Sequence, residues 1–254
     1  MSQRPTVTAC LIIIGSEILS GRTRDANLPF LAERLNELGV RLLEARIIPD
    51  TAGAIVSAVN ECRAVYDYVF TTGGIGPTHD DITAECVARA FGVPLERNPE
   101  AVRRLERHYA NTGIELNQAR LRMANVPAGA TLIDNPVSNA PGFQIGNVLV
   151  MAGVPDIMRA MFEGAKHRIT GGAPMRSRTV SCLLPEGDLA QGLGALQDRY
   201  PDIEIGSYPY FRRGGFGVSV VLRATDTEPL TGALEALCDL IRRLGGEPIM
   251  QAKD

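Results

Sequence analysis

The sequence of 254 residues lacks the patterns that mark cysteine-stabilised and membrane-spanning proteins. Its five cysteines are odd in number, scattered along the chain and never spaced as Cys-x-x-Cys, which argues against a disulfide framework or a zinc finger. We expect them to pack as small hydrophobes. No apolar run approaches the ~20 residues that a membrane span requires. The first residues pass into a strand-like run without a signal-peptide pattern, so we expect a cytoplasmic protein.

The chain also lacks the charge that a nucleic-acid binder needs. Its 26 Lys and Arg against 29 Asp and Glu give a formal net charge of -3, so its overall field attracts neither nucleic acid nor anionic membrane. Residues 208–215 mix aromatics, arginines and glycines, as single-strand binders do. A hairpin loop with ordinary surface aromatics is the favoured interpretation, and we expect neither a nucleic-acid nor a membrane partner.

The common nucleotide and esterase motifs are absent as well. Gly74 and Gly76 start a dinucleotide fingerprint, but His79 stands where its third glycine belongs. No Gly-Lys-Ser/Thr sequence of a P-loop follows any glycine turn, and no Gly-x-Ser-x-Gly elbow occurs. Any phosphate-binding turn in this chain is therefore of another kind.

Strands alternate with helices over the first two thirds of the chain. Hydrophobic periodicity predicts strands at residues 7–14, 40–48, 67–72 and 148–151. The same criterion predicts helices at residues 24–38, 52–63, 80–91, 99–111, 117–124 and 156–168. This alternation predicts a three-layer α/β fold, in which a parallel sheet with a mixed edge carries helices on both faces.

The rhythm changes after residues 170–174, a glycine- and proline-containing segment that we interpret as a linker. The elements predicted beyond it are, in order, a strand, a helix, two strands and a helix, at residues 178–184, 188–200, 203–208, 216–224 and 228–244. We therefore expect an α/β domain at residues 1–170 and a small α+β domain at residues 175–254.

The most informative segment is the glycine-rich turn at residues 73–78, between a predicted strand and a predicted helix. Glycines let backbone N–H groups approach an anion closely, because they have no side chain. Ligands of an open parallel sheet bind outside the carboxyl ends of the strands, where the strand order reverses. Residues 15–21, which include Glu17, and residues 153–155 also follow strands, so we expect these three loops to converge on one site.

Two interpretations of the neighbouring Asp80 and Asp81 stay open. Thr78 followed three residues later by Asp81 matches a helix capping box, and acidic residues suit a helix N-terminus. Carboxylates beside a glycine turn also suit Mg²⁺, which binds through one or two carboxylates plus substrate phosphates. Glu17 is either a solvated loop charge or a member of the same site.

The segment from Thr71 to Asp81 resembles the signature of the molybdopterin-binding domain of molybdenum-cofactor biosynthesis proteins (MoaB/Mog-like). Its form Gly-Gly-Ile-Gly-Pro-Thr-x-Asp-Asp is similar to the CinA-like (competence/damage-inducible protein A) branch. Residues 15–27, 135–143 and 153–155 are similar to that branch too, so the resemblance covers residues 5–170.

The resemblance has two further consequences for organisation. The C-terminal part is similar to the small KH-like domain that often follows this domain. Because the chain ends at Asp254, we do not expect the amidohydrolase domain of longer CinA proteins. The chain departs from the family at Ser138 and Asn139, where Gly-Thr is usual, and at Ala152 and Ile157, where Pro and Glu are usual.

The resemblance implies a phosphate-containing small molecule as ligand, and a homo-oligomer. Some family members are described as metal-dependent pyrophosphatases that split ADP-ribose, whereas others bind molybdopterin. It implies that Asp80 and Asp81 hold a divalent metal (Mg²⁺, Mn²⁺ or Co²⁺) and that Glu17 positions water. The ligand-binding positions that it implies are Gly15, Asp25, Asn27, Thr72, Gly73, Gly74, Gly76, Pro77, Thr78, Asn139, Pro141, Gly142, Gly153 and Pro155. A non-catalytic molybdopterin- or nucleotide-binding module is the alternative.

Overall fold

The computed structural model describes residues 6–110, 112–212 and 215–251, and it divides the chain into two units, residues 1–172 and 173–254. The predicted helix at 99–111 therefore ends in a residue outside this range, Asn111, and the predicted loop at 208–215 includes two more, Arg213 and Gly214. Within the described ranges, no helix combines the length and the apolar character that crossing a bilayer demands.

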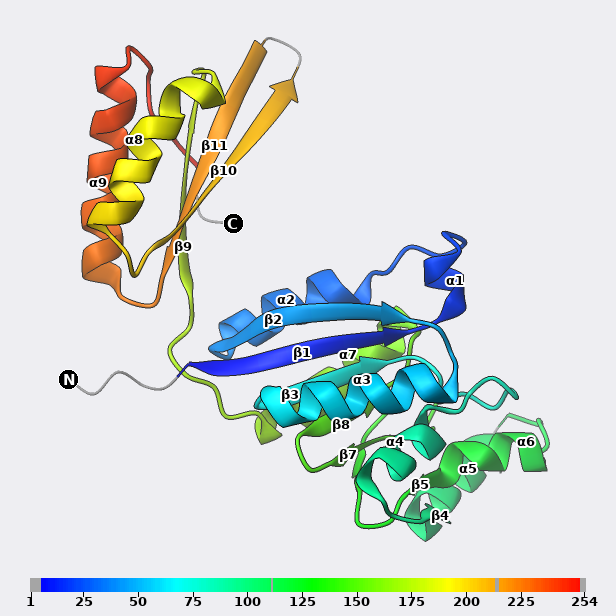
Figure 1. The fold of residues 1–254 in the computed structure, drawn as a ribbon. Coiled ribbons are helices and arrows are strands. Elements are labelled where there is room, and N and C mark those ends of the chain that lie inside the picture. The colour runs from blue at the N-terminus through cyan, green and yellow to red at the C-terminus, as the bar shows by residue number, and fades with distance from the viewer. Residues whose placement is uncertain (1–5, 111, 213–214, 252–254) are drawn as a thin grey trace. The chain divides into compact units, whose positions relative to one another are not determined.

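The first unit is built on a six-stranded sheet with the order β2-β1-β3-β8-β7-β6 (Figure 1). Four strands run parallel: β1 (Val7–Ile14), β2 (Val40–Ile48), β3 (Tyr68–Thr72) and β8 (Val148–Met151). Two short strands add an antiparallel edge: β7 (Gly142–Ile145) and β6 (Thr131–Ile133). The predicted α/β fold with a mixed edge is confirmed.

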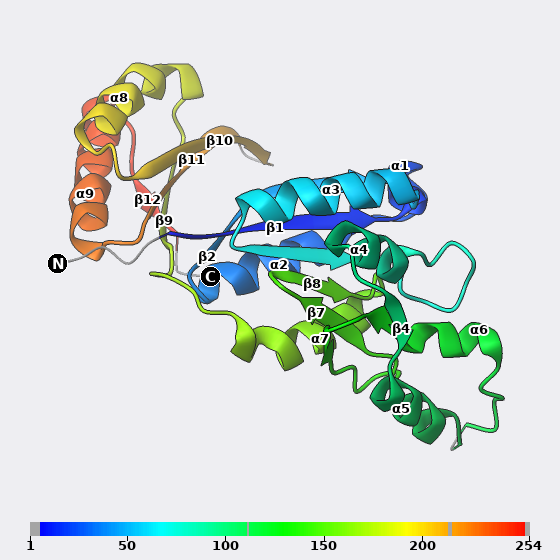
Figure 2. The same ribbon diagram turned by 60° about the horizontal axis from the view of Figure 1, so that its bottom comes forward.

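The centre of this sheet is buried on both faces. Successive side chains of a strand point to opposite faces, so Ala9, Leu11 and Ile13 of β1 join one core cluster and the residues between them join the other. Helices cover both faces (Figures 1 and 2): one face carries α2 (Asn27–Glu37) and α7 (Pro155–Ala165), and the other carries α3 (Ala52–Val65) and α4 (Thr83–Phe91). Burial on both faces explains why β1 is one continuous apolar run.

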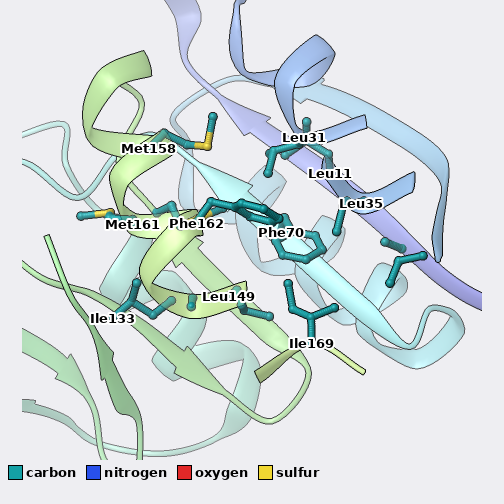
Figure 3. Packing of buried hydrophobic residues seen from close by; sticks show 14 of the residues in the cluster. Leu11, Leu31, Leu35, Phe70, Ile133, Leu149, Met158, Met161, Phe162 and Ile169 are labelled. Carbon is teal, nitrogen blue, oxygen red and sulfur yellow. The ribbon is translucent and has the colours of Figure 1, made fainter. Parts of the chain in front are cut away.

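Aromatic and aliphatic side chains fill the core beneath α2 and α7 (Figure 3). Phe70 of β3 and Phe162 of α7 lie with their ring centroids 6.2 Å apart, and both side chains are buried. Leu31 and Leu35, two of the periodic leucines that predict α2, pack into the same cluster. This core holds the strands and helices whose ends form the loops described below.

Short elements account for most of the differences from the predicted order. The sequence pattern does not reveal the edge strands β6 and β7, the helix α1 (Ser16–Leu19), or the two-stranded ribbon of β4 (Leu95–Arg97) and β5 (Asn125–Pro127). The two polar helices are present as α5 (Pro99–Ala110) and as α6 (Gln118–Leu121) continued by the 3-10 turn η1 (Arg122–Ala124). A similar turn, η2 (Lys166–Arg168), extends α7.

The second unit is a four-stranded sheet, ordered β10-β11-β9-β12, with two helices. Its elements in sequence are β9 (Arg176–Cys182), α8 (Glu186–Arg199), β10 (Glu204–Arg212), β11 (Gly215–Ala224), α9 (Thr227–Arg243) and β12 (Ile249–Met250). The predicted α+β order is confirmed, with β12 added. The predicted hairpin is confirmed, because β10 and β11 pair antiparallel, but the predicted loop bounds of 208–215 are wrong, because the pairing continues to Arg212 and Gly215.

Candidate functional site

The three glycine-containing loops meet where the strand order of the first sheet reverses. β2 lies on one side of β1, whereas β3 and β8 lie on its other side. The carboxyl ends of β1, β3 and β8 lead into Gly15, Gly73 and Gly153, and all three residues line a cavity of about 610 Å³. Such a crevice is where open α/β sheets bind ligands, and its volume suits a small molecule.

Many of the sequence-predicted site residues line this cavity, and others do not. Those that line it are Gly15, Glu17, Gly73, Gly74, Gly76, Pro77, Asp80, Asp81, Gly153 and Pro155. Those outside its lining are Asp25, Asn27, Thr72, Thr78, Asn139, Pro141 and Gly142. The structure thus brings the three loops together and leaves part of the predicted set outside the lining of this cavity.

Glycine is required where these loops pack against each other. Gly73 and Gly74 have φ of 103° and 66°, in the left-handed region. A Cβ on Gly73 would lie 2.2 Å from the carbonyl oxygen of Ile14, and a Cβ on Gly153 would lie 3.2 Å from the Cα of Gly73. Side chains there would separate the loops and change the shape of the cavity.

Three consecutive backbone amides of the turn have no acceptor within the described ranges of the chain. The N–H of Gly73 donates to the carbonyl of Met151 at 3.1 Å, so this amide is already used. Among the residues that the structure describes, none accepts a hydrogen bond from the amides of Gly74, Ile75 or Gly76. Consecutive amides of this kind form a concave donor surface for an anion.

The turn is closed by Asp81. Its Oδ2 accepts hydrogen bonds from the N–H and the hydroxyl of Thr78. The capping-box interpretation is wrong for helix α4, which begins at Thr83 and has Ile82 as its N-cap. The helix was predicted to span residues 80–91, but it begins at Thr83. Asp80 and Asp81 therefore lie in the turn that precedes it. The nearby Thr78 side chain and a backbone amide lower the pKa of the exposed Asp80 carboxyl.

Carboxylates dominate the charge of the cavity. Glu17, Asp50, Asp80 and Asp81 line it, and no lysine or arginine of the described chain does. Asp50 follows β2, and its Oδ1 accepts hydrogen bonds from the N–H and the hydroxyl of Ser16, at 2.6 and 2.8 Å. Asp50 was not among the predicted site residues, although its position just after a parallel strand is typical of a ligand-binding residue.

Two residues expected to touch ligand instead organise the loops. Asp25 Oδ2 accepts a hydrogen bond from the N–H of Leu28 at 2.8 Å, in the first turn of α2. The side chain of Asn27 is buried, and its Nδ2 donates to the carbonyl of Gly153 at 2.8 Å. Asn27 therefore ties α2 to the third loop of the site.

The segment before β7 contributes a different part of the wall. The buried side chain of Asn135 donates to the carbonyl of Ala140 at 2.8 Å and accepts from the N–H of Ser138 at 3.2 Å. Asn139 has a positive φ of 56°, and its side chain lies 3.1 Å from a ring nitrogen of His108. Ser138 and Ala140 consequently face the cavity, whereas Asn139 turns toward α5.

Apolar residues from distant elements complete the lining. Tyr109 comes from α5, Met123 from η1, and Ile157 and Met161 from α7. Sequence analysis did not assign these residues to the site, because no local pattern shows that α5 and η1 border the glycine loops. Flat aromatic groups pack well against aromatic, aliphatic and thioether side chains. The cavity thus combines a polar loop region with an apolar wall.

Comparison with known families agrees with this architecture. Residues 10–170 match the family described as "Probable molybdopterin binding domain". Residues 174–244 match the family described as "FAD synthase, middle domain". The match to the first family covers more than half of the chain, and it includes all three loops of the cavity.

Individual relatives point to the same family. A CinA-like protein of Citrifermentans bemidjiense is 43% identical over 60% of this chain and 38% of its own length. A probable FAD synthase of Caenorhabditis elegans is 30% identical over 95% of this chain and 51% of its own length. The crystal structure of CinA from Thermoplasma acidophilum matches 65% of this chain and 99% of its own, with 31% identity and a TM-score of 0.60. The chain therefore belongs to the molybdopterin-binding domain family, and its first unit is a CinA-like member of it.

Proposed function

We propose that the cavity binds a nucleotide diphosphate and that the chain is a metal-dependent pyrophosphatase acting on ADP-ribose or a similar nucleotide sugar. One observation carries the proposal: the amides of Gly74, Ile75 and Gly76, which have no acceptor among the described residues, lie beside a group of carboxylates in a single cavity. The amides suit phosphate oxygens, and the carboxylates suit a hard divalent cation.

The charge of the cavity supports a requirement for metal. Four carboxylates line it without a described lysine or arginine, so a dianionic diphosphate would be repelled on its own. The described residues show no group of three ligands preassembled at Asp80 and Asp81. This fits Mg²⁺-type binding, in which one or two carboxylates share the ion with substrate phosphates.

The residues have distinct roles in this proposal. The amides of Gly74, Ile75 and Gly76 hold the diphosphate, and Asp80 and Asp81 hold the metal. Glu17 orients a water molecule and accepts its proton as the water attacks phosphorus, which gives AMP and ribose 5-phosphate from ADP-ribose. When bound, the metal would stabilise negative charge on the phosphoryl oxygens. The apolar wall with Tyr109 and Met123 receives the flat base.

The test follows AMP release from ADP-ribose by the purified chain with Mg²⁺, Mn²⁺ or Co²⁺, and again with a chelator. Asp80→Asn should lower turnover by about 10²-fold or more, because it removes a charged group that acts on the reacting phosphate. Asp198→Asn is the matched control, since Asp198 lies exposed on α8 of the second unit. Equal turnover in Asp80→Asn and the unmutated chain would refute the catalytic role.

A non-catalytic binding module is the second candidate. The family match and the relative named probable FAD synthase favour a pterin or flavin nucleotide as ligand. In that case molybdopterin or FAD would bind without being cleaved, and Asp80→Asn would change affinity alone. Running FAD beside ADP-ribose in the same assay, with binding measured separately, distinguishes the two candidates.

We also propose a homo-oligomer in the cytoplasm. Leu43 and Ile47 are 60% and 44% exposed on β2, an edge strand of its sheet, and such an apolar strip suits association. All five cysteines are free thiols, as is usual in a reducing compartment. Light scattering on Leu43→Lys beside the unmutated chain tests the first proposal: a monomeric variant supports it, and an unchanged mass contradicts it.

A further inference from the structure

A second group of ligand-bearing side chains lies outside the cavity lining. One ligand atom from each of Cys10, Glu44 and Cys62 falls within 4.8 Å of the others. The sulfur atoms of Cys10 and Cys62 are 3.3 Å apart, and both side chains are fully buried. Across the described parts of the chain, this is the one group of three such residues that meets this distance.

A β-bulge creates the group. Ala9 of β1 pairs with Leu42 of β2, but the next residue, Cys10, pairs with Glu44, so that Leu43 is the extra residue. A one-residue shift moves a side chain to the other face of a sheet. Without the bulge Leu43 would pair with Cys10, and Glu44 would be directed away from it. The bulge thus brings a carboxylate to two thiols in an otherwise apolar interior.

The carboxylate is also held in place. Tyr66 donates from its hydroxyl to Glu44 Oε2 at 2.6 Å, and Arg46 donates from Nε to Oε1 at 2.5 Å. Arg46 also donates a hydrogen bond to Glu61, so its guanidinium group keeps an acidic partner if Glu44 binds a metal ion. The side chains of Glu44 and Arg46 are 33% and 30% exposed, which gives the two buried thiols a route to solvent.

Charge balance permits a divalent cation between Cys10 and Cys62. Burial raises the pKa of both cysteines, so both are neutral thiols at neutral pH. A divalent cation that binds to two thiolates displaces two protons, which leaves the total charge of Cys10, Cys62, Glu44, Glu61 and Arg46 unchanged. Binding therefore buries no additional net charge.

The sulfur separation favours a metal over a disulfide. Sulfur ligands on a tetrahedral zinc ion with bonds of about 2.3 Å lie about 3.8 Å apart. The observed 3.3 Å needs an opening of about 0.5 Å for such an ion, but a closing of about 1.3 Å for a disulfide.

We propose that Cys10, Cys62 and Glu44 form a binding site for a thiophilic divalent cation such as Zn²⁺. Two thiolates and one carboxylate supply three ligands, and water entering beside Glu44 supplies the fourth. The ion joins β1, β2 and α3, so it stabilises the first unit and takes no part in hydrolysis at Asp80 and Asp81. The proposal does not depend on the proposed function.

Co²⁺ is the probe that reports this site directly, because thiolate ligands give a sulfur-to-cobalt charge-transfer band that oxygen ligands do not give. Titrating the reduced, metal-free chain should show one such ion per chain and release of two protons per ion. Cys10→Ala and Cys62→Ala should abolish the band, and Glu44→Gln should weaken Co²⁺ binding about tenfold or more. Cys86→Ala is the control, since Cys86 is equally buried in the same core cluster.

Three results would overturn the proposal. These are no band in the folded, reduced chain, a band that persists in Cys62→Ala, and a band that Cys86→Ala removes as completely as Cys10→Ala does. If a cysteine variant fails to fold by circular dichroism, Glu44→Gln decides: Zn²⁺ should raise the unfolding temperature of the unmutated chain clearly more than that of Glu44→Gln, and an equal rise refutes the site.

Discussion

Replacing Gly74 with alanine should destabilise the first unit more than replacing Gly92. Both glycines have φ of 66°, so left-handed strain costs each variant about 1–2 kcal/mol. A Cβ on Gly92 meets no atom within 4 Å, whereas a Cβ on Gly74 would lie 2.2 Å from Thr83 Oγ1. That hydroxyl is buried and donates to the carbonyl of Gly73 at 3.0 Å. Losing this bond adds about 1–3 kcal/mol, so Gly74→Ala should cost about 2–5 kcal/mol in total.

Hydrogen exchange of β1 and β3 amides, followed by mass spectrometry, is the appropriate assay, because a chain with two units need not unfold in one step. The double variant Gly74→Ala with Thr83→Ala isolates the contact: once the hydroxyl is gone, the added cost of Gly74→Ala should fall to that of Gly92→Ala. Equal costs for Gly74→Ala and Gly92→Ala in the unmutated background would refute the steric argument.

Further changes test other parts of the structure. Asn27→Ala should destabilise the first unit by about 1–3 kcal/mol and increase amide hydrogen exchange at Gly153, because it leaves the Gly153 carbonyl without its donor. Unchanged hydrogen exchange at Gly153 would contradict the role of Asn27 in holding this loop. Phe162→Ala should lower the free energy of unfolding, measured with a chemical denaturant, by about 3–5 kcal/mol, because Phe162 is a large and fully buried side chain. Volume-conserving substitutions cost less than about 1.5 kcal/mol, so a loss below that value would mean that the core refills the space. The hydrogen bond to Glu44 raises the pKa of Tyr66 to about 12. A tyrosine in the unfolded chain has a pKa of about 10, so the neutral Tyr66 side chain stabilises the fold fully below that pH, and this stabilisation is lost as the pH rises through about 12. An ultraviolet titration should show one tyrosine that ionises late and that Tyr66→Phe removes, and a titration unchanged by that substitution would contradict the bond.

Periodicity predicted the long elements because burial dictates their composition. β1 is apolar from Ala9 to Ile14 since both of its faces are covered there, and the spacing of Leu31 and Leu35 follows the face of α2. The short strands β6 and β7 mix polar or glycine residues with apolar ones, whereas β8, which is as short as β7, is apolar throughout and was predicted. Helix α4 begins at Thr83 and not at the predicted Asp80, because Asp81 accepts a hydrogen bond from Thr78 and closes a turn before the helix.

A general rule about parallel sheets predicted that the three loops of the site converge, but no rule predicted which residues form the apolar wall of the cavity. Carboxyl ends of parallel strands meet at one edge, so the loops after β1, β3 and β8 could be placed together from the sequence. Tyr109 and Met123 reach the cavity through the path of α5 and η1, which no local pattern encodes. Cys10 and Cys62 are 52 residues apart, and only the bulge at Leu43 turns Glu44 toward them.

Equilibrium binding of a non-hydrolysable ADP-ribose analogue, with a methylene group in place of the oxygen between the two phosphorus atoms, tests the central claim most directly when measured by calorimetry with and without Mg²⁺ at constant ionic strength. The cavity has four carboxylates beside the amides of Gly74, Ile75 and Gly76, for which the described part of the chain supplies no acceptor, so binding should require the metal and should weaken strongly in Asp80→Asn. Asp198→Asn should bind as the unmutated chain does. Metal-independent binding of equal strength, or no binding under either condition, would contradict the assignment of this cavity as a metal-assisted diphosphate site.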